Sequence, residues 1–270
     1  MSISYGRSAS FTVRLWTMRA AITSLAAREL KGKYAGTYGG LFWALLQPLS
    51  VTLVFWLVFS LGFRATGPQN TAYIVYFLTG YVAWQFVLDL VNGSATALAS
   101  YSYLLRKSLF STEAVLAMKL LIGLTEHAIF LLVVLVIVVV HGMWPGWSML
   151  KLLYGFPMLL AIVISLMLLV ATSSVIYPDL GQLISILLNV WFWMTPIAWV
   201  AQSISPSFRV VLDWNPIVGV IDIYRQALAY GDPVVGNEHS VLIYWIVVPA
   251  AVVLGMLLHT RWRAAAIDAL

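Results

Sequence analysis

Four ionisable side chains fall in or near long apolar stretches of this chain: Asp89, Lys119, Glu126 and His127. A charge is costly in lipid, so each is a candidate for a transport path or a structural pair. We expect Asp89 and Lys119 near the cytoplasmic ends of their segments, where snorkelling to the interface is the simpler account. Glu126 should lie deeper, and its seven-residue separation from Lys119 is too long for a direct pair. We favour structural or channel-lining roles for these side chains.

The motifs of soluble and membrane enzymes are absent from the sequence. There is no HExxH, no GxSxG and no cysteine, and the four histidines are scattered. Lys31-Gly32-Lys33 lacks the glycine spacing and the following Ser or Thr of a phosphate-binding loop. We therefore expect no catalytic residue, no metal and no cofactor on this chain. If transport uses ATP, the ATP and Mg²⁺ must bind a separate ATPase chain.

The composition indicates a membrane protein. Hydrophobic residues make up 62% of the 270 residues and charged residues 9%, with a mean hydropathy of +0.93. Soluble domains carry about 25% charged residues, and a spanning helix needs about 20 mostly apolar residues. We predict an all-α polytopic membrane protein whose six transmembrane helices cover residues 41–63, 72–91, 115–140, 150–176, 183–201 and 241–260.

The distribution of basic residues predicts that both chain ends are cytoplasmic. Six Arg and Lys side chains precede the first span, and the inside segments also hold Arg106, Lys107, Arg261 and Arg263. No cleavable signal peptide is visible. The net charge of +5 is better explained by this orientation than by a nucleic-acid partner. We divide the chain into a cytoplasmic N-terminus (1–40), a transmembrane domain (41–260) and a cytoplasmic tail (261–270).

Residues 11–30 read as an amphipathic helix before the first span. Apolar side chains recur every three to four residues, and basic side chains lie mostly away from that stripe. Such a helix can lie in the interface plane, with head-group contacts from Arg14, Trp16, Arg28 and Lys31. The alternative is an ordinary surface helix with no partner role.

The inside loop 92–113 contains the sequence Tyr101-Ser102-Tyr103-Leu104-Leu105-Arg106-Lys107-Ser108-Leu109-Phe110. It is compatible with a helix, mixes basic and aromatic residues, and is too polar to span a membrane. One interpretation is a basic membrane anchor, and the other is a docking helix for a cytoplasmic partner.

The segment 177–228 begins with a polar break and contains several prolines after an apolar span. Pro206, Pro216 and Pro233 would each interrupt a helix. Irregular backbone at membrane depth survives only against protein or water. We predict two short re-entrant or interfacial helices, near residues 207–213 and 217–230.

Aromatic residues make up 14% of the chain, and six of them fall within the predicted spans. Aromatic faces suit the apolar C–H faces of sugar rings. A glycan channel could therefore be lined by Trp56, Tyr81, Trp84, Phe86, Trp191 and Trp193. Packing toward lipid is an equally good interpretation of any one of them.

Several fragments together resemble the ABC-2-type permeases of bacterial polysaccharide exporters, the group of Wzm, KpsM and TagG. These fragments are Arg28-Glu29-Leu30-Lys31-Gly32-Lys33-Tyr34, Gly39-Gly40-Leu41-Phe42-Trp43-Ala44-Leu45-Leu46-Gln47-Pro48, Leu105-Arg106-Lys107-Ser108-Leu109-Phe110, Thr195-Pro196-Ile197, Trp214-Asn215-Pro216 and Tyr224-Arg225. Two positions depart from the family pattern: Ser111 stands where Pro is common, and Pro178 precedes Asp179 in place of Arg.

The resemblance implies a homodimer in the bacterial inner membrane, joined to two cytoplasmic ABC ATPase subunits in a 2:2 complex that exports a lipid-linked glycan. It implies ATPase-coupling roles for Tyr101, Tyr103, Arg106, Lys107, Phe110, Glu113 and Asp179. It implies that the external exit is shaped by Pro196, Trp214, Asn215, Pro216, Tyr224 and Arg225. The alternatives are an ABC-2 permease for drugs or small lipids and an ion-coupled secondary transporter. The second is disfavoured because few intramembrane acids and no inverted repeat are visible.

Overall fold

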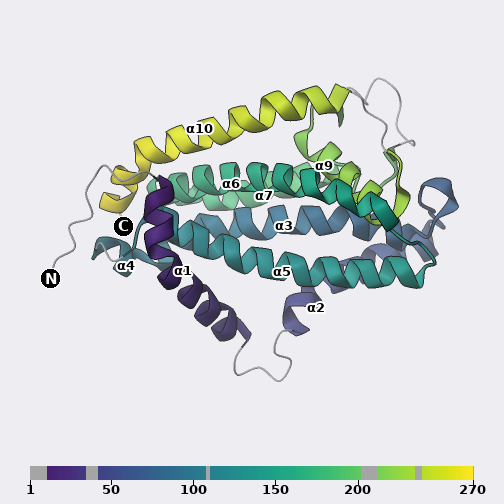
Figure 1. Cartoon of the computed structure of the whole chain (residues 1–270), viewed down its shortest axis with the longest axis horizontal. Coiled ribbons are helices and arrows are strands. Elements are labelled where there is room, and N and C mark those ends of the chain that lie inside the picture. The colour runs from purple at the N-terminus through teal and green to yellow at the C-terminus, as the bar shows by residue number, and fades with distance from the viewer. Residues whose placement is uncertain (1–10, 35–41, 108–109, 202–211, 235–238, 270) are drawn as a thin grey trace.

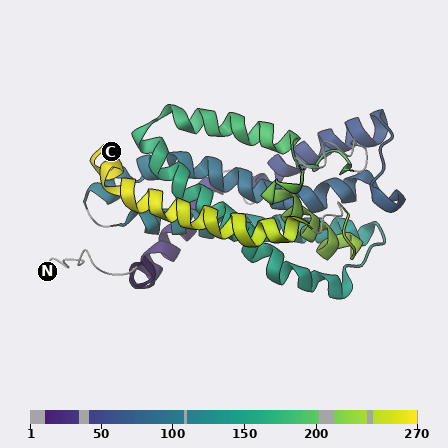
Figure 2. The same cartoon turned by 90° about the horizontal axis from the view of Figure 1, so that it is seen from above.

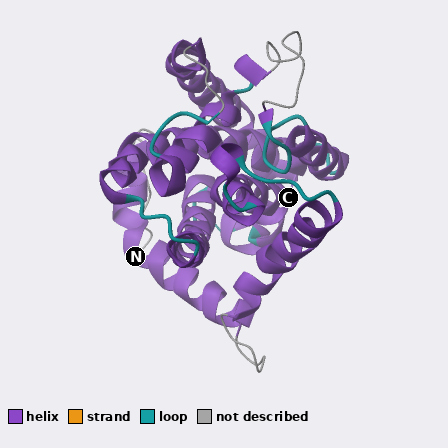
Figure 3. Cartoon of the chain, turned by 90° about the vertical axis from the view of Figure 1, so that its right-hand side faces the viewer, coloured by secondary structure: helices purple, strands orange, loops and turns teal. Residues whose placement is uncertain are grey.

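A computed structural model describes residues 11–34, 42–107, 110–201, 212–234 and 239–269. Within these ranges every regular element is a helix (Figure 3), which confirms the predicted all-α class. The long helices run side by side along one axis, as two perpendicular views show (Figures 1 and 2). In chain order the elements are α1 (Phe11–Tyr34), α2 (Phe42–Phe55), the π-helical η1 (Trp56–Gly62), the 3₁₀ turn η2 (Pro68–Asn70), α3 (Tyr73–Ser100), α4 (Ser102–Arg106), α5 (Thr112–Val140), the 3₁₀ helix η3 (Gly146–Lys151), α6 (Leu152–Ile176), α7 (Asp179–Trp193), α9 (Pro216–Arg225), the π-helical η5 (Gln226–Tyr230) and α10 (His239–Ala269).

Helix α3 forms the centre of the bundle. It packs against α5, α6, α7 and α9. In the most apolar 18-residue stretch of α3, 83% of the residues are buried. The corresponding value for the span formed by α2 and η1 is 11%. A helix that is apolar all round is suited to such a central position. The first span, by contrast, leaves most of its apolar surface uncovered in a single chain.

Five helical segments of the described chain are long and apolar enough to cross a membrane: Leu45–Gly62, Tyr73–Ser100, Thr112–Val140, Gly146–Ile176 and Ile246–Ala269. They correspond to five of the six predicted spans. The second runs nine residues beyond its predicted end, so that much of the expected loop 92–113 is helix.

The fifth predicted span, 183–201, is shorter in the structure than the sequence suggested. Helix α7 has 15 residues, about 22 Å at 1.5 Å per residue, whereas the apolar layer is about 30 Å thick. The expected end at Ala201 is wrong because Pro196 has no N–H for a helical hydrogen bond, and Thr195 before it is disfavoured in a helix. The chain turns at Met194–Trp199 instead.

Helix α1 extends the predicted helix 11–30 to Tyr34. Its apolar stripe packs on α5, where Ile22 and Ala26 are buried with Ala114, Met118 and Ile122. The opposite face is open, and Trp16 is 68% exposed. The stripe is therefore covered by protein in this chain.

The predicted external helix 217–230 is present as α9 and η5. All residues of α9 from Ile217 to Arg225 are buried, because α9 packs between α3 and α6 and against α10. It is a core element of the external half. Most of the other predicted external helix, 207–213, falls outside the described residues.

Candidate functional site

The segment predicted to couple to an ATPase lies between α3 and α5 and contains the single-turn helix α4. Figure 1 shows α4 at the same end of the bundle as α1 and the end of α10. The Oγ of Ser111 accepts a hydrogen bond from the Ala114 N–H at 3.2 Å and so caps α5. Phe110 N–H donates to Leu104 O at 3.4 Å, which folds the segment back on itself. The segment is therefore compact, and we call its described residues, 101–107 and 110–111, the knob.

The knob has an exposed cationic and aromatic face. Tyr103 is 63% exposed, and Arg106 and Lys107 are also exposed. The Lys107 Nζ donates to the Tyr103 hydroxyl at 2.7 Å and lies 4.4 Å from the centre of its ring. A cation held over an aromatic ring keeps its charge at a defined place on the surface.

The inner side of the knob is anchored in the bundle. Leu105 is 3% exposed, and Phe110 is half-buried against the core. The hydroxyl of Tyr101 donates to Glu29 of α1 at 2.5 Å. Burial, and next the bond to Glu29, raise the pKa of Tyr101, so the phenol remains a neutral donor. Phe110 and Tyr101 therefore position the knob, while Tyr103, Arg106 and Lys107 face outward.

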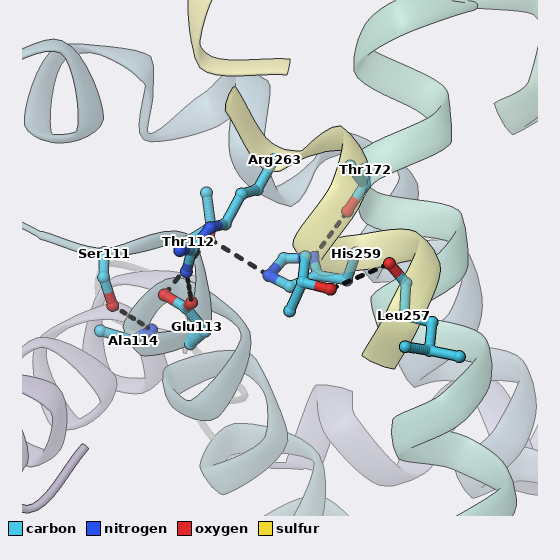
Figure 4. Close-up of polar contacts among 9 residues, drawn as sticks. Ser111, Thr112, Glu113, Ala114, Thr172, Leu257, His259 and Arg263 are labelled. Atoms are coloured by element: carbon cyan, nitrogen blue, oxygen red, sulfur yellow. Dashed lines mark hydrogen bonds and ion pairs between the residues drawn. The ribbon is translucent and has the colours of Figure 1, made fainter. Parts of the chain in front are cut away.

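Glu113 faces inward, not toward a partner surface (Figure 4). Its side chain is 3% exposed, and its Oε1 lies 3.0 Å from Nη1 of Arg263 on α10. The structure thus ties Glu113 to α10, and its predicted ATPase-coupling role stays a prediction. Its buried charge is balanced by the ion pair.

A second set of bonds joins α10 to both α5 and α6. His259 of α10 is buried, with Nε2 3.3 Å from the Thr112 hydroxyl and Nδ1 2.7 Å from the Thr172 hydroxyl (Figure 4). Thr112 opens α5 and Thr172 lies near the end of α6. Sequence reasoning missed His259 and Arg263 as partners of the coupling segment. Their spacing of four residues, which puts them on one face of α10, was the available signal.

Asp179 is exposed at the first position of α7, directly after the turn that follows α6. None of its described contacts reaches the knob, so its coupling role stays a prediction. On α1, Arg28 and Lys31 are exposed, and the Arg19 guanidinium lies 4.3 Å from the ring centre of Trp16. The side chain of Arg14 lies outside the described part.

Two of the ionisable residues of the spans, Lys119 and Glu126, form ion pairs with α1. The Lys119 Nζ lies 2.5 Å from Glu29 Oε1, and Lys33 Nζ lies 2.7 Å from Glu126 Oε1. Lys119 and Glu126 do not pair with each other, as their spacing predicted. The sequence did not indicate that the interface helix supplies both partners.

At the end of the bundle away from α4, Arg225 and its neighbours stabilise the break after α7. Arg225 is fully buried; its Nη2 donates to Pro196 O at 2.7 Å, and its guanidinium lies 3.8 Å from the Tyr76 ring centre. The hydroxyls of Tyr73 and Tyr76 donate to carbonyls of Ala198 and Trp199 at 2.7 and 2.8 Å. Irregular backbone at membrane depth needs such donors.

Asn215 connects the same break to α9. Its Oδ1 accepts from Trp191 Nε1 at 2.9 Å and from Ile217 N–H at 3.3 Å, and its Nδ2 donates to Thr195 Oγ1 at 3.0 Å. Pro216 occupies the first helical position, where a missing N–H costs nothing. The structure thus joins Pro196, Asn215, Pro216 and Arg225 in one cluster. Trp214 is 68% exposed and points away, and Tyr224 bonds to His127 at 3.1 Å.

The predicted channel aromatics divide into two groups. Tyr81, Trp84 and Phe86 are each at most 4% exposed, and Trp84 meets Trp191 edge-on at 5.6 Å. Tyr81 and Trp84 pack the core of the subunit and do not line an open channel in this structure. Trp56 and Trp191 are half-buried and Trp193 is 56% exposed; a lining role for these remains a prediction.

The described residues hold no group of three or more His, Cys, Asp or Glu side chains placed to bind a metal ion.

Five helices of spanning length and apolarity, within the described residues, are typical of an integral membrane protein. The chain belongs to the ABC-2 type transporter family, whose sequence profile matches residues 20–229. It is similar to the O-antigen export system permease protein RfbA of Myxococcus xanthus, with 28% identity over 80% of this chain and 82% of the relative. It also resembles RfbA of Klebsiella pneumoniae (21%, 80% and 82%) and the polysialic acid transport protein KpsM of Escherichia coli (22%, 79% and 83%).

Proposed function

We propose that this chain is the permease subunit of an ATP-driven exporter that carries lipid-linked polysaccharide of the O-antigen, capsule or teichoic acid type across the bacterial inner membrane. The family match and relatives named for O-antigen export and polysialic acid transport support this substrate class. ATP and Mg²⁺ bind a separate cytoplasmic ATPase. Helix α7, with the turn that follows it, serves as the fifth of six crossings, which leaves both chain ends inside.

The observation that carries the coupling role is the exposed face of α4. Tyr103, Arg106 and Lys107 present two positive charges and an aromatic ring, while Leu105 is buried beneath them. Basic and aromatic side chains are suited to recognition of an acidic cleft on a partner protein. Since Tyr101 ties the knob to α1 and Glu113 ties the start of α5 to α10, a push on α4 is passed to several helices together.

The uncovered apolar face of the first span supports a homodimer. Five exposed side chains mark it: Leu53, Val54, Leu57, Val58 and Leu61. Helix α7 exposes a similar row: Leu183, Ile186, Leu187, Val190 and Trp193. Two copies facing each other through α2 and α7 would enclose a passage between them. In the 2:2 complex, closure of the ATPases on ATP would move the knobs and open that passage.

Deletion of the gene tests the substrate. We expect undecaprenyl-linked polymer to accumulate in the cytoplasm and surface glycan to be lost, both being restored by the wild-type gene. Unchanged surface glycan would refute polysaccharide export and favour a permease for drugs or small lipids. Transport that stops with a proton uncoupler but continues without ATP hydrolysis would favour a secondary transporter.

Charge reversal tests the coupling face. In the double variant Arg106→Glu/Lys107→Glu we expect export to fall at least about ten-fold, because two contacts between opposite charges become repulsive. Recovery of the ATPase with the permease in pull-downs should fall in parallel. Arg261→Glu, an exposed charge change near the end of α10, is the matched control. Normal ATPase binding and export by the double variant would show that α4 is not the docking element.

A further inference from the structure

A cavity of about 460 Å³ lies between α1, α2, α3 and α5. Its charged side chains are Glu29 and Lys33 of α1, Asp89 of α3, and Lys119 and Glu126 of α5; the neutral amides of Gln47 and Gln85 and the imidazole of His127 also line it. The rest of the wall is largely apolar and includes the indole of Trp43 and the ring of Phe130. The export mechanism proposed above does not use this cavity.

The charges of the described wall leave one carboxylate without a cationic counterpart at ion-pair distance. Each lysine matches a glutamate: Lys119 with Glu29 at 2.5 Å, and Lys33 with Glu126 at 2.7 Å. The fifth charged group is Asp89, whose Oδ1 accepts from the neutral amide of Gln85 at 2.8 Å. Three acids against two bases make the wall net negative by one charge, which disfavours a phosphate or diphosphate as sole ligand.

An orphaned acceptor stands beside this carboxylate. Gln85 is 6% exposed, and its Oε1 has no hydrogen-bond partner among the described residues. A buried acceptor without a donor costs free energy comparable to a lost hydrogen bond. Because Gln85 and Asp89 both line the cavity, an occupant with a positive charge and several N–H donors satisfies both groups.

The position of the cavity along the spans indicates the source of such an occupant. Asp89 lies sixteen residues after Tyr73, the external start of α3, or about 24 Å along the helix axis. With an apolar layer about 30 Å thick, this is close to the cytoplasmic head-group level. Lys33, with 55% of its side chain exposed, lies at the open side of the wall. A lipid of the inner leaflet can reach this depth with its chains still in the apolar layer.

We propose that the cavity binds the head group of an aminophospholipid of the phosphatidylethanolamine type. The primary ammonium is held by Asp89 and by Oε1 of Gln85, and the phosphate lies toward the lysine side of the wall. The bound lipid fills the space between α1 and the spans and so fixes α1 against α3 and α5. The proposal does not depend on the identity of the exported substrate.

Native mass spectrometry of the full chain tests this site. The chain is reconstituted in nanodiscs of equal phosphatidylethanolamine and phosphatidylglycerol, and the lipid retained after release is counted. We expect wild-type protein to retain phosphatidylethanolamine preferentially. Asp89→Asn should lower that preference about ten-fold, since a hydrogen bond to a charged group is replaced by a neutral one. Asp268→Asn, which removes an exposed carboxylate on the tail, should leave the preference unchanged.

A second cavity variant and a second lipid identify the occupant. Gln85→Met, similar in size but without the acceptor, should lower the preference in the same direction and serves if Asp89→Asn fails to fold. Phosphatidylcholine, whose quaternary ammonium has no N–H, should be retained about ten-fold more weakly. Equal retention of the two lipids by wild-type protein, or an unchanged preference in both cavity variants, would overturn the proposal. Displacement of the lipid by millimolar soluble phosphoethanolamine would show that the bound head group comes from a soluble compound and not from a lipid.

Discussion

The buried carboxylate of Glu113 is paired with an arginine near the C-terminal end of the sequence, Arg263. Arg263 lies 150 residues away in sequence but 3.0 Å away in space, and Thr112 donates to the second carboxylate oxygen at 3.3 Å. A buried acid with one cationic partner is sensitive to loss of that partner, because the remaining charge stays in a poorly polar environment. The same logic applies to Arg225, whose charge is held by carbonyls and an aromatic ring.

Arg263→Ala should destabilise the protein by about 1 to 3 kcal/mol, since it removes the ion-pair partner of a buried acid that keeps its other hydrogen bond. Thermal unfolding of the purified chain measures the effect. Arg261→Ala, an exposed neighbour, is the control. The loss from Arg263→Ala should be smaller when Glu113→Gln is already present. Equal losses in both backgrounds would show that the pair carries no coupling energy.

Gly80→Ala should impair folding and export, because a Cβ at this position would come 2.8 Å from Arg225 Nη2 and 3.0 Å from Ile221 Cγ2. Both neighbours are buried, so neither can move without losing packing. The matched control is Gly93→Ala on the same helix, where no atom lies within 4 Å of the new Cβ and a gain of about 0.5 to 1 kcal/mol is expected. The amount of each variant in the membrane and its thermal unfolding measure the two effects. Normal stability of Gly80→Ala would mean that Arg225 is not held as described.

At the scale of elements, α1 is attached to the bundle by side chains of α5 and by Tyr101, which lies between α3 and α4. Glu29 accepts from Tyr101 and Lys119, Lys33 meets Glu126, and an apolar stripe packs on α5. The polar fasteners lie in the second half of α1, whereas Trp16 and Arg19 lie on the open surface of the first half. Helix α1 is therefore hydrogen-bonded to the knob through the Glu29 carboxylate.

Glu29→Gln should loosen this attachment, because the ion pair with Lys119 becomes a neutral contact. We expect hydrogen exchange of residues 15–34 to quicken by about ten-fold, in line with the loss of one charge-assisted bond. Lys31→Gln, on the exposed face of the same helix, should exchange as the wild type does. Unaltered exchange in Glu29→Gln would assign the attachment of α1 to its apolar stripe alone.

At the scale of the whole molecule, the described chain leaves its first span largely uncovered. Only 11% of the Leu45–Gly62 window is buried, although the neighbouring window in α3 is 83% buried. In lipid an apolar face alone does not enforce association, so the contact between copies must come from close packing of side chains. The chain contains no cysteine, which makes the proximity of two copies directly measurable.

Leu57→Cys in the otherwise unchanged chain should form a disulfide-linked dimer in oxidised membranes, since Leu57 lies on the face proposed to meet its copy. Leu132→Cys on α5 is the control, being 63% exposed but on another helix. Reducing and non-reducing gels distinguish the outcomes. Crosslinking from Leu132 and none from Leu57 would place the dimer contact on α5 and not on the first span, which α2 and η1 form.

The sequence alone determined the all-α class, five of the spans and the helix before them, because hydropathy and helical period are local properties of the chain. Proline also marked the external break, although it stopped α7 earlier than hydropathy suggested. Only the tertiary structure decided which distant groups meet: Glu113 with Arg263, Lys33 with Glu126, Arg225 with the carbonyl of Pro196. It also separated buried Trp84 from exposed Trp193. These pairings depend on how the helices pack, and the residue pattern of one helix does not specify which helix packs against it.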